Sequence, residues 1–397
     1  MTRIAALALL LAACVSAPRS DYVPGGAGLP PDARAEYRAA LDASRRGDGA
    51  GALRIYADLC ARHPLHLGLH LARLRLAKAQ EGPEAAAALY RVPVAGMSPE
   101  IADVLVVLAT LEENDLAGRR SILQFAVERE PREPLWRLGL ADIELRAHDL
   151  VVDRASGARE LGSVDASARA FEEARQILDR AQREAEAALA LDAGLAEAHL
   201  MLGYIRTRRA DLQSDYARRD SERADATRCY EAALALDPAS VPARVNLAEN
   251  LLYLGRHEHA IRELEIASKL APGRALVWRN LGVAFWTAGR ESEAERAYRK
   301  SLELEPESSR THVALADCLQ ARGDMQGALR ELRLARDGAG EDRELRATIA
   351  FKLGAVHEFR REYEPAVEEY REHIRLGGRD SAKARSRIER IFENPGG

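Results

Sequence analysis

The stretch VWRNLGVAFWTAGRESEAERAYRKSLELEP, from Val277 to Pro306, is a near-copy of ARVNLAENLLYLGRHEHAIRELEIASKLAP, which runs from Ala243 to Pro272, 34 residues earlier. The period continues on both sides of these copies. Four slots return every 34 positions: Leu247, Leu281 and Leu315; Gly255, Gly289 and Gly323; Ala226, Ala260, Ala294 and Ala328; and Pro238, Pro272 and Pro306. Self-similarity at a fixed period of this length indicates a stacked repeat architecture.

Each copy has the pattern of two helices joined by a tight turn. Leu281, Gly282 and Phe285 lie at i, i+1 and i+4 on the first helix, where Gly282 lets the second helix approach closely. Gly289 stands at the turn, where a positive φ favours glycine. Ala294 and Tyr298 form a stripe on the second helix. One such hairpin cannot bury its own apolar faces, so the hairpins must stack.

These slots also resemble a known family. Its spacing, W-x2-L-G-x2-Y, A-x3-F and P, is reproduced by Trp278, Leu281, Gly282, Phe285, Ala294, Tyr298 and Pro306, and is typical of tetratricopeptide repeats. The resemblance implies an all-α fold, a solenoid of hairpins wound into a right-handed α-α superhelix. We expect about nine hairpins over residues 33–380, with insertions at 147–165 and 208–221 and a capping helix at the C-terminal end.

The composition agrees with a helical chain and excludes some classes of partner. The chain of 397 residues is 47% hydrophobic and only 5% aromatic, and Ala, Leu, Glu and Arg dominate it. Its 58 Lys and Arg residues against 62 Asp and Glu residues leave a formal net charge of −4. No basic field suited to nucleic acid is implied, so we expect no nucleic-acid partner.

The domain organisation follows from the quality of the repeats and from the first residues. We expect a signal peptide at 1–13, a modified cysteine and flexible tether at 14–32, degenerate repeats at 33–131, repeats with insertions at 132–240, well-formed repeats at 241–380, and a capping helix and tail at 381–397.

The N-terminus has the pattern of an export signal. Arg3 is followed by an apolar run and then by Leu11, Ala12, Ala13 and Cys14. This segment resembles the bacterial lipoprotein signal, which implies cleavage before Cys14 and lipidation of its sulfur. Because Val15 follows Cys14, the resemblance favours the outer over the inner membrane. We therefore expect a lipid-anchored protein that faces the periplasm. The alternative is an ordinary secretory signal with an incidental cysteine.

Catalytic and metal-binding patterns are incomplete. His357 and Glu358 are not followed by the second histidine of a zinc-protease helix. His63, His66 and His70 have the spacing of a metal clip, but no carboxylate or thiol stands at coordinating spacing beside them. We expect no cofactor, no metal and no enzymatic activity, because the insertions are shorter than a catalytic domain.

A binding surface is expected on the face of the first helices that lines the concave side of the solenoid. Apolar and amide side chains on a face that should be wet suggest a groove for a protein or peptide. The predicted partner-binding residues are Tyr204, Val245, Asn246, Leu252, Arg279, Asn280, Val283 and Trp286. Asn246 and Asn280 match a family position that in some members grips the backbone of an extended peptide. The alternative is that Trp286 packs on its own neighbours.

Three classes of function remain open at this stage. The first is a non-catalytic scaffold lipoprotein that assists assembly of a complex in the bacterial cell envelope. The second is a peptide-binding regulatory or receptor module that controls a periplasmic or secretion-system partner. The third, an enzyme, requires one of the insertions to complete a site.

Overall fold

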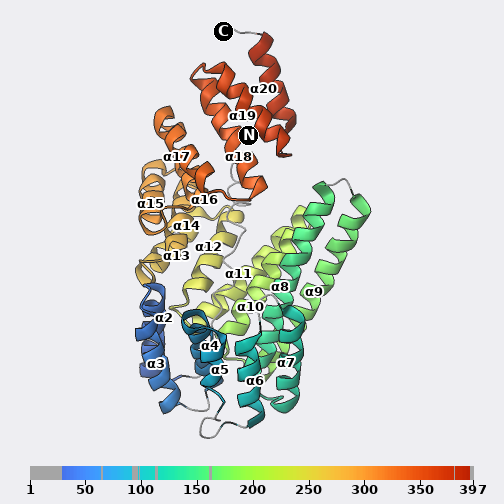
Figure 1. The fold of residues 1–397 in the computed structure, drawn as a ribbon, viewed down its shortest axis with the longest axis vertical. Coiled ribbons are helices and arrows are strands. Elements are labelled where there is room, and N and C mark those ends of the chain that lie inside the picture. Colours follow the sequence, from blue (N-terminus) through green and yellow to red (C-terminus); the bar gives the residue numbers. More distant parts are fainter. Residues whose placement is uncertain are drawn as a thin grey trace. The chain divides into compact units, whose positions relative to one another are not determined.

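The computed structural model describes residues 29–63, 66–91, 97, 99–111, 115–160, 163–379 and 381–393. Over these residues its regular structure is entirely helical (Figure 1). The helices are α2 (Pro31–Arg45), α3 (Gly49–Arg62), α4 (Leu67–Glu81), α5 (Pro83–Ala88), α6 (Pro99–Thr110), α7 (Leu116–Arg129), α8 (Pro134–Glu160), α9 (Val164–Leu191), α10 (Ala196–Asp211), α11 (Tyr216–Leu236), α12 (Val241–Tyr253), α13 (His257–Leu270), α14 (Ala275–Thr287), α15 (Glu291–Leu304), α16 (Ser309–Ala321), α17 (Met325–Gly338), α18 (Arg343–Phe359), α19 (Tyr363–Arg375) and α20 (Ser381–Glu393).

The chain divides into two compact units. The described residues up to Asn250 form the N-terminal unit, and those from Leu251 onward form the C-terminal unit. In the C-terminal unit α14 packs on α15, α16 on α17 and α18 on α19, and each hairpin packs on the next. This arrangement confirms the predicted all-α solenoid of helical hairpins.

The expected signal peptide and Cys14 lie outside the described residues. Within the described part, no helix combines the length and the apolar character needed to cross a bilayer.

A glycine on the first helix and a tyrosine on the second close several hairpins. The pairs are Gly203 with Tyr230, Gly282 with Tyr298, and Gly354 with Tyr370. A Cβ atom at the three glycines would stand 2.3, 2.5 and 2.7 Å from the nearest ring carbon, closer than real Cβ contacts. All three tyrosines are fully buried. The prediction that Gly282 permits close approach of the second helix is therefore confirmed.

Four hairpin turns of the C-terminal unit share a backbone conformation with positive φ, and one of the four has a residue other than glycine at that position. Gly255, Gly289 and Gly323 have φ values of 73°, 77° and 84° at the turn that follows each first helix. The corresponding turn between α18 and α19 has Arg361, with a φ of 62°, the only non-glycine residue with positive φ in the described part of the chain. A side chain in this left-handed region strains the backbone, because its Cβ crowds the carbonyl oxygen.

Replacing Arg361 with glycine should therefore stabilise the C-terminal unit. We expect Arg361→Gly to raise the free energy of unfolding by about 1 kcal/mol, measured by urea denaturation. Gly289→Ala is the matched control and should lower the same quantity by a similar amount. An Arg361→Gly protein no more stable than the natural one would show that the turn is not strained.

The first insertion, 147–165, lengthens two helices. α8 has 27 residues and α9 has 28, and the two run side by side as a long hairpin (Figure 1). The buried face of α9 carries alanines at positions that allow close packing: Ala170, Ala174, Ala181, Ala185 and Ala188. The second insertion, 208–221, contains the end of α10, the connection and the beginning of α11.

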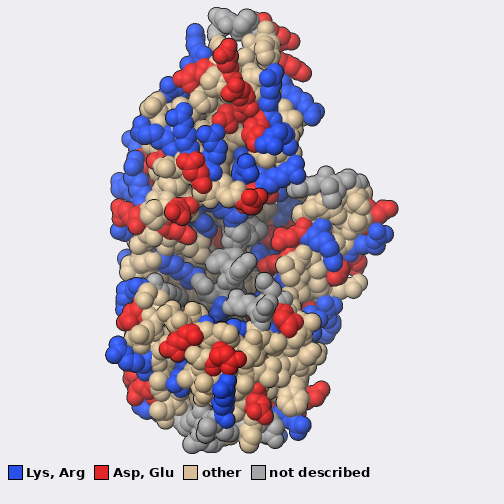
Figure 2. Space-filling view, viewed as in Figure 1, with Lys and Arg blue, Asp and Glu red and all other residues tan. Residues whose placement is uncertain are grey.

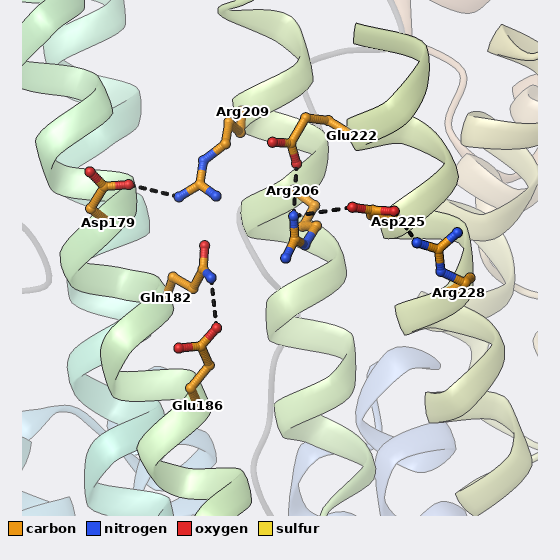
Figure 3. A network of polar contacts seen from close by, with 8 residues as sticks. All are labelled: Asp179, Gln182, Glu186, Arg206, Arg209, Glu222, Asp225 and Arg228. Carbon is orange, nitrogen blue, oxygen red and sulfur yellow. Dashed lines mark hydrogen bonds and ion pairs between the residues drawn. The ribbon is translucent and has the colours of Figure 1, made fainter. Parts of the chain in front are cut away.

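Three arginines near the end of α10 tie it to its neighbours. Arg206 pairs with Glu222 (3.1 Å) and with Asp225 (3.3 Å), both on α11, as Figure 3 shows. Arg209 pairs with Asp179 on α9 at 2.8 Å (Figure 3). Arg208 pairs with Asp149 on α8 at 3.2 Å. These ion pairs thus link α10 to α8, α9 and α11.

A buried arginine just after the second insertion forms an ion pair with a residue inside it. Arg223, on α11, is fully buried and forms an ion pair with Asp211 at the end of α10. Its guanidinium also donates to Asn250 Oδ1 at 2.6 Å. Asn250 Nδ2 donates to Thr207 Oγ1 at 3.2 Å, and Thr207 shares a hydrogen bond of 3.1 Å with the Tyr230 hydroxyl. This network joins α10, α11 and α12 in the N-terminal unit.

We expect Arg223→Ala to lower the free energy of unfolding of the N-terminal unit by about 3–5 kcal/mol, because it removes the donor to the buried Asn250 Oδ1 and the ion-pair partner of the part-exposed Asp211. Arg206→Ala removes two part-exposed ion pairs and should cost about 1 kcal/mol or less. Urea denaturation followed by circular dichroism compares the two variants. Equal losses would contradict the anchoring role of Arg223.

The last helix covers the end of the repeat stack. α20 packs on α19 through Ala384 and Ile391, which are buried. Its Arg387 pairs with Glu358 of α18 at 2.7 Å and donates to the Tyr370 hydroxyl at 3.0 Å. The outer face of α20 is polar, as expected of a capping helix.

Candidate partner-binding surface

The eight predicted partner-binding residues are divided between the two units. Tyr204, Val245 and Asn246 lie in the N-terminal unit, whereas Leu252, Arg279, Asn280, Val283 and Trp286 lie in the C-terminal unit. Tyr204 and Asn246 are brought into contact, and Arg279, Asn280, Val283 and Trp286 share α14.

The three aliphatic residues of this set are buried. Val245, Leu252 and Val283 each expose 5% of their surface or less. In the C-terminal unit the first helices of successive hairpins contact one another, α14 with α16 and α16 with α18, so part of the face expected to be open is covered. This burial corrects the assignment of Val245, Leu252 and Val283 to a solvent-facing groove, since in this structure they are core residues.

Asn246 uses its amide group within the protein. Its Nδ2 atom donates to the Tyr204 hydroxyl at 3.2 Å and to the Pro242 carbonyl at 2.6 Å. Both amide hydrogens are therefore engaged. The Tyr204 ring packs edge-on against Tyr230, with ring centroids 6.0 Å apart. Asn246 and Tyr204 thus join α12 to α10, and binding of a peptide by the amide hydrogens would require these bonds to open.

Asn280, one repeat later, differs from Asn246 in its hydrogen bonding. Its side chain is 7% exposed, and its Oδ1 atom has no hydrogen-bond partner among the described residues. The neighbouring Arg279 is half-buried, and its Nε atom also lacks a partner in the described part of the chain. Trp286 lies further along α14 and is half-buried. α14 therefore carries an unused acceptor, an unused donor and a part-exposed aromatic ring.

The distribution of charged side chains does not indicate a partner-binding surface. Acidic and basic side chains are interspersed over the face shown in Figure 2, in agreement with the small net charge. Many of them form pairs on neighbouring helices, such as Lys352 with Asp317 at 2.6 Å between α18 and α16. Lys352 and Asp317 hold successive first helices together.

The cysteines outside the N-terminal segment have the environment of packing residues. Cys60, Cys229 and Cys318 are free thiols, and Cys60 and Cys318 are buried. Burial raises the pKa of Cys60 to about 11 and also raises the pKa of Cys229 and of Cys318. The thiols are therefore protonated near neutral pH and are weak nucleophiles.

Of the three histidines considered for a metal site, His70 is a packing residue. His70 is fully buried and packs against the Tyr90 ring, with centroids 5.6 Å apart. His63 and His66 flank the connection between α3 and α4. No group of three His, Cys, Asp or Glu residues that could hold a metal ion occurs within the described ranges.

Sequence reasoning missed the network of Arg223, Asp211, Asn250 and Thr207. Asp211 lies within the second insertion and has no counterpart in the repeat, so the 34-residue period gave no signal for its pairing with Arg223. An arginine and an aspartate 12 residues apart at the two ends of an insertion are the only hint that the sequence offers.

Two matches to tetratricopeptide-repeat sequence families cover residues 245–308 and 285–350. The chain is similar to the Small glutamine-rich tetratricopeptide repeat-containing protein 2 of Mycosarcoma maydis, with 33% identity over 91 residues, which are 23% of this chain and 26% of the relative. It is also similar to the Probable biofilm formation methyltransferase WspC of Pseudomonas aeruginosa, with 37% identity over 87 residues, 22% of this chain and 20% of the relative. The chain thus spans about a quarter of these relatives or less.

Among solved structures, the human IFIT1 dimer with m7Gppp-AAAA has a TM-score of 0.56 to this chain at 13% identity, covering 93% of this chain and 87% of that one. This likeness supports the fold alone. The repeated hairpins and their packing define an all-α solenoid protein. The two family matches identify tetratricopeptide repeats within residues 245–350. Such repeats generally mediate protein–protein interaction, and their fold is generally non-catalytic.

Proposed function

We propose that this protein is a non-catalytic scaffold lipoprotein of the bacterial cell envelope, which binds a protein or peptide partner and assists assembly of an envelope complex. The repeat fold supports the binding role. The anchor is supported by the sequence from Leu11 to Cys14 and its resemblance to a lipoprotein signal. Attachment at Cys14 would leave the repeats facing the periplasm, with the outer membrane favoured by Val15.

The state of α14 carries the binding part of the proposal. A buried polar atom without a partner costs about 1–3 kcal/mol, so the Asn280 carbonyl and the Arg279 Nε–H would each be stabilised by a ligand group that reached it. The backbone of an extended peptide offers an N–H and a C=O group at short spacing. Trp286 on the same helix supplies the kind of aromatic ring that dominates the binding energy of interfaces.

The partner contact can be tested on α14. We expect Trp286→Ala to weaken binding of the partner by about 2 kcal/mol, and Asn280→Ala by about 1 kcal/mol, while the helical signal is kept. Asn246→Ala is the matched control, because its amide is already bonded within the protein, and it should weaken binding less than Asn280→Ala. Binding is measured by titrating each variant with the partner recovered by cross-linking in native membranes.

A Trp286→Ala protein that melts at a much lower temperature, yet binds normally per folded molecule, would make Trp286 a packing residue. The assignment of the partner-binding surface to α14 would then be wrong.

The anchor is tested separately. Cys14→Ser removes the sulfur that carries the lipid, so the protein should leave the membrane fraction for the soluble periplasmic fraction or stay unprocessed. Membrane fractionation followed by immunoblotting measures the shift, with Cys60→Ser as the control. If Cys14→Ser fractionates like the natural protein, the lipoprotein proposal fails, whereas the binding role of α14 is unaffected.

The second candidate is a regulatory or receptor module that controls a periplasmic or secretion-system partner. The name of the Pseudomonas aeruginosa relative, a probable biofilm formation methyltransferase, is compatible with it, because a segment similar to this chain belongs there to a protein named for biofilm formation. A scaffold should be required for a complex to assemble, whereas a regulator should change the activity of a complex that assembles without it.

A further inference from the structure

One hydrogen bond recurs at three repeat boundaries. In each case a side chain near the start of a first helix reaches back six residues to the carbonyl of the proline that ends the previous unit. The bonds are Arg244 Nη2 to Pro238 O at 2.7 Å, Trp278 Nε1 to Pro272 O at 2.8 Å, and His312 Nε2 to Pro306 O at 2.8 Å. The three donors are 34 residues apart, so the same position of the repeat forms this hydrogen bond at each of the three boundaries.

The three donors differ in how they respond to pH. The donors at the Pro238 and Pro272 carbonyls are a guanidinium and an indole N–H, two groups that do not change protonation in the physiological pH range. The imidazole of His312 has an ordinary pKa of about 6.5 and can lose one of its two N–H donors near neutral pH. Of these three boundaries, only the one between α15 and α16 therefore depends on a titratable donor.

His312 stands between two acceptors. The His312 residue is 7% exposed. Its Nε2 faces the Pro306 carbonyl, which comes from the turn after α15, and its Nδ1 lies 2.7 Å from the Glu331 carboxylate on α17. Only the imidazolium has an N–H for each of them. The neutral ring keeps one donor and turns a lone pair toward the other acceptor, so that one of the two bonds is lost.

The charges around the ring favour the protonated form. Burial by itself lowers the pKa of His312, but the hydrogen bonds to Glu331 and to the Pro306 carbonyl outweigh it, and the pKa is raised above 6.5. Within the described part of the chain, Glu331 is the charged group that acts on His312. A raised pKa in the folded state means that protonation stabilises the fold.

We propose that His312 is a proton-operated latch between two repeats: as an imidazolium it fastens α16 to both the end of α15 and α17, and as a neutral ring it releases one of them. The stabilisation is fully present below about pH 6.5, the ordinary value, and is lost as the pH rises through the folded-state pKa. The contact of α16 with either the end of α15 or α17 therefore loosens with rising pH, while the boundaries fastened by Arg244 and Trp278 do not respond.

The first test is a titration of the histidine side chains by NMR on the full-length protein. The His312 resonance is assigned from its absence in His312→Gln. Its midpoint is expected above 6.5, and Glu331→Gln should move that midpoint down. A midpoint at or below 6.5 in the natural protein would overturn the latch, because the imidazolium would then gain nothing from its two acceptors.

The second test exchanges His312 for the donors that the other boundaries use. The melting temperatures of the natural protein, His312→Arg and His312→Trp are compared from about pH 6 to about pH 9. The natural protein should fall relative to His312→Arg by about 2–4 °C as the pH rises, since its latch opens and the arginine does not. His312→Trp should parallel His312→Arg in slope.

A difference between the natural protein and His312→Arg that stays constant over this range would overturn the proposal. If His312→Trp does not fold, the comparison with arginine still decides, because the Arg244 boundary shows that the slot accepts a guanidinium. Both tests are independent of the lipid anchor and of the partner, so the latch can fail without affecting the proposed function, and the reverse.

Discussion

The contact between a tyrosine ring and a glycine backbone sets the separation of the two helices in a hairpin, and the stacking of hairpins depends on that separation. Where the first helix has Gly282 or Gly354, the second has Tyr298 or Tyr370, and the ring lies where a Cβ would otherwise be. The hairpin between them in sequence has Ala316 and Leu332 at the same two slots, both buried. Compared with the glycine–tyrosine hairpins, Ala316 adds a methyl group on the first helix, and Leu332 replaces the tyrosine ring with a smaller side chain on the second helix. The volume at the contact is balanced, which keeps successive hairpins similar enough to stack.

The fold was predictable because the residues that determine it lie close together in the sequence. Gly282, Tyr298 and Gly289 act within one hairpin, and the 34-residue period repeats that hairpin along the chain. The binding surface was less predictable. Whether Val283 faces a partner or a neighbouring helix depends on how closely α14 and α16 approach, which no local pattern contains. The network around Arg223 was beyond the repeat pattern as well, because its partners come from three helices with an insertion between them.

Identical residues at one repeat position have different roles in this chain. Asn246 and Asn280 occupy the same slot, but Asn246 is bonded to Tyr204 and Pro242, whereas the Asn280 carbonyl has no partner among the described residues. Conversely, different residues fill one role, as Arg244, Trp278 and His312 do at the prolyl carbonyls. The period therefore identifies positions reliably, while the chemistry at each position has to be established from its own contacts.

The three tryptophans of the chain are unevenly distributed, and this gives the protein built-in optical reporters. Trp136 is fully buried in the N-terminal unit and donates to Glu130 at 3.0 Å, whereas Trp278 and Trp286 are half-buried in the C-terminal unit. A buried indole emits at shorter wavelength than one in contact with water. The blue edge of the fluorescence spectrum thus reports on the N-terminal unit and the red edge on the C-terminal unit, so the state of each can be followed in the intact, unlabelled protein.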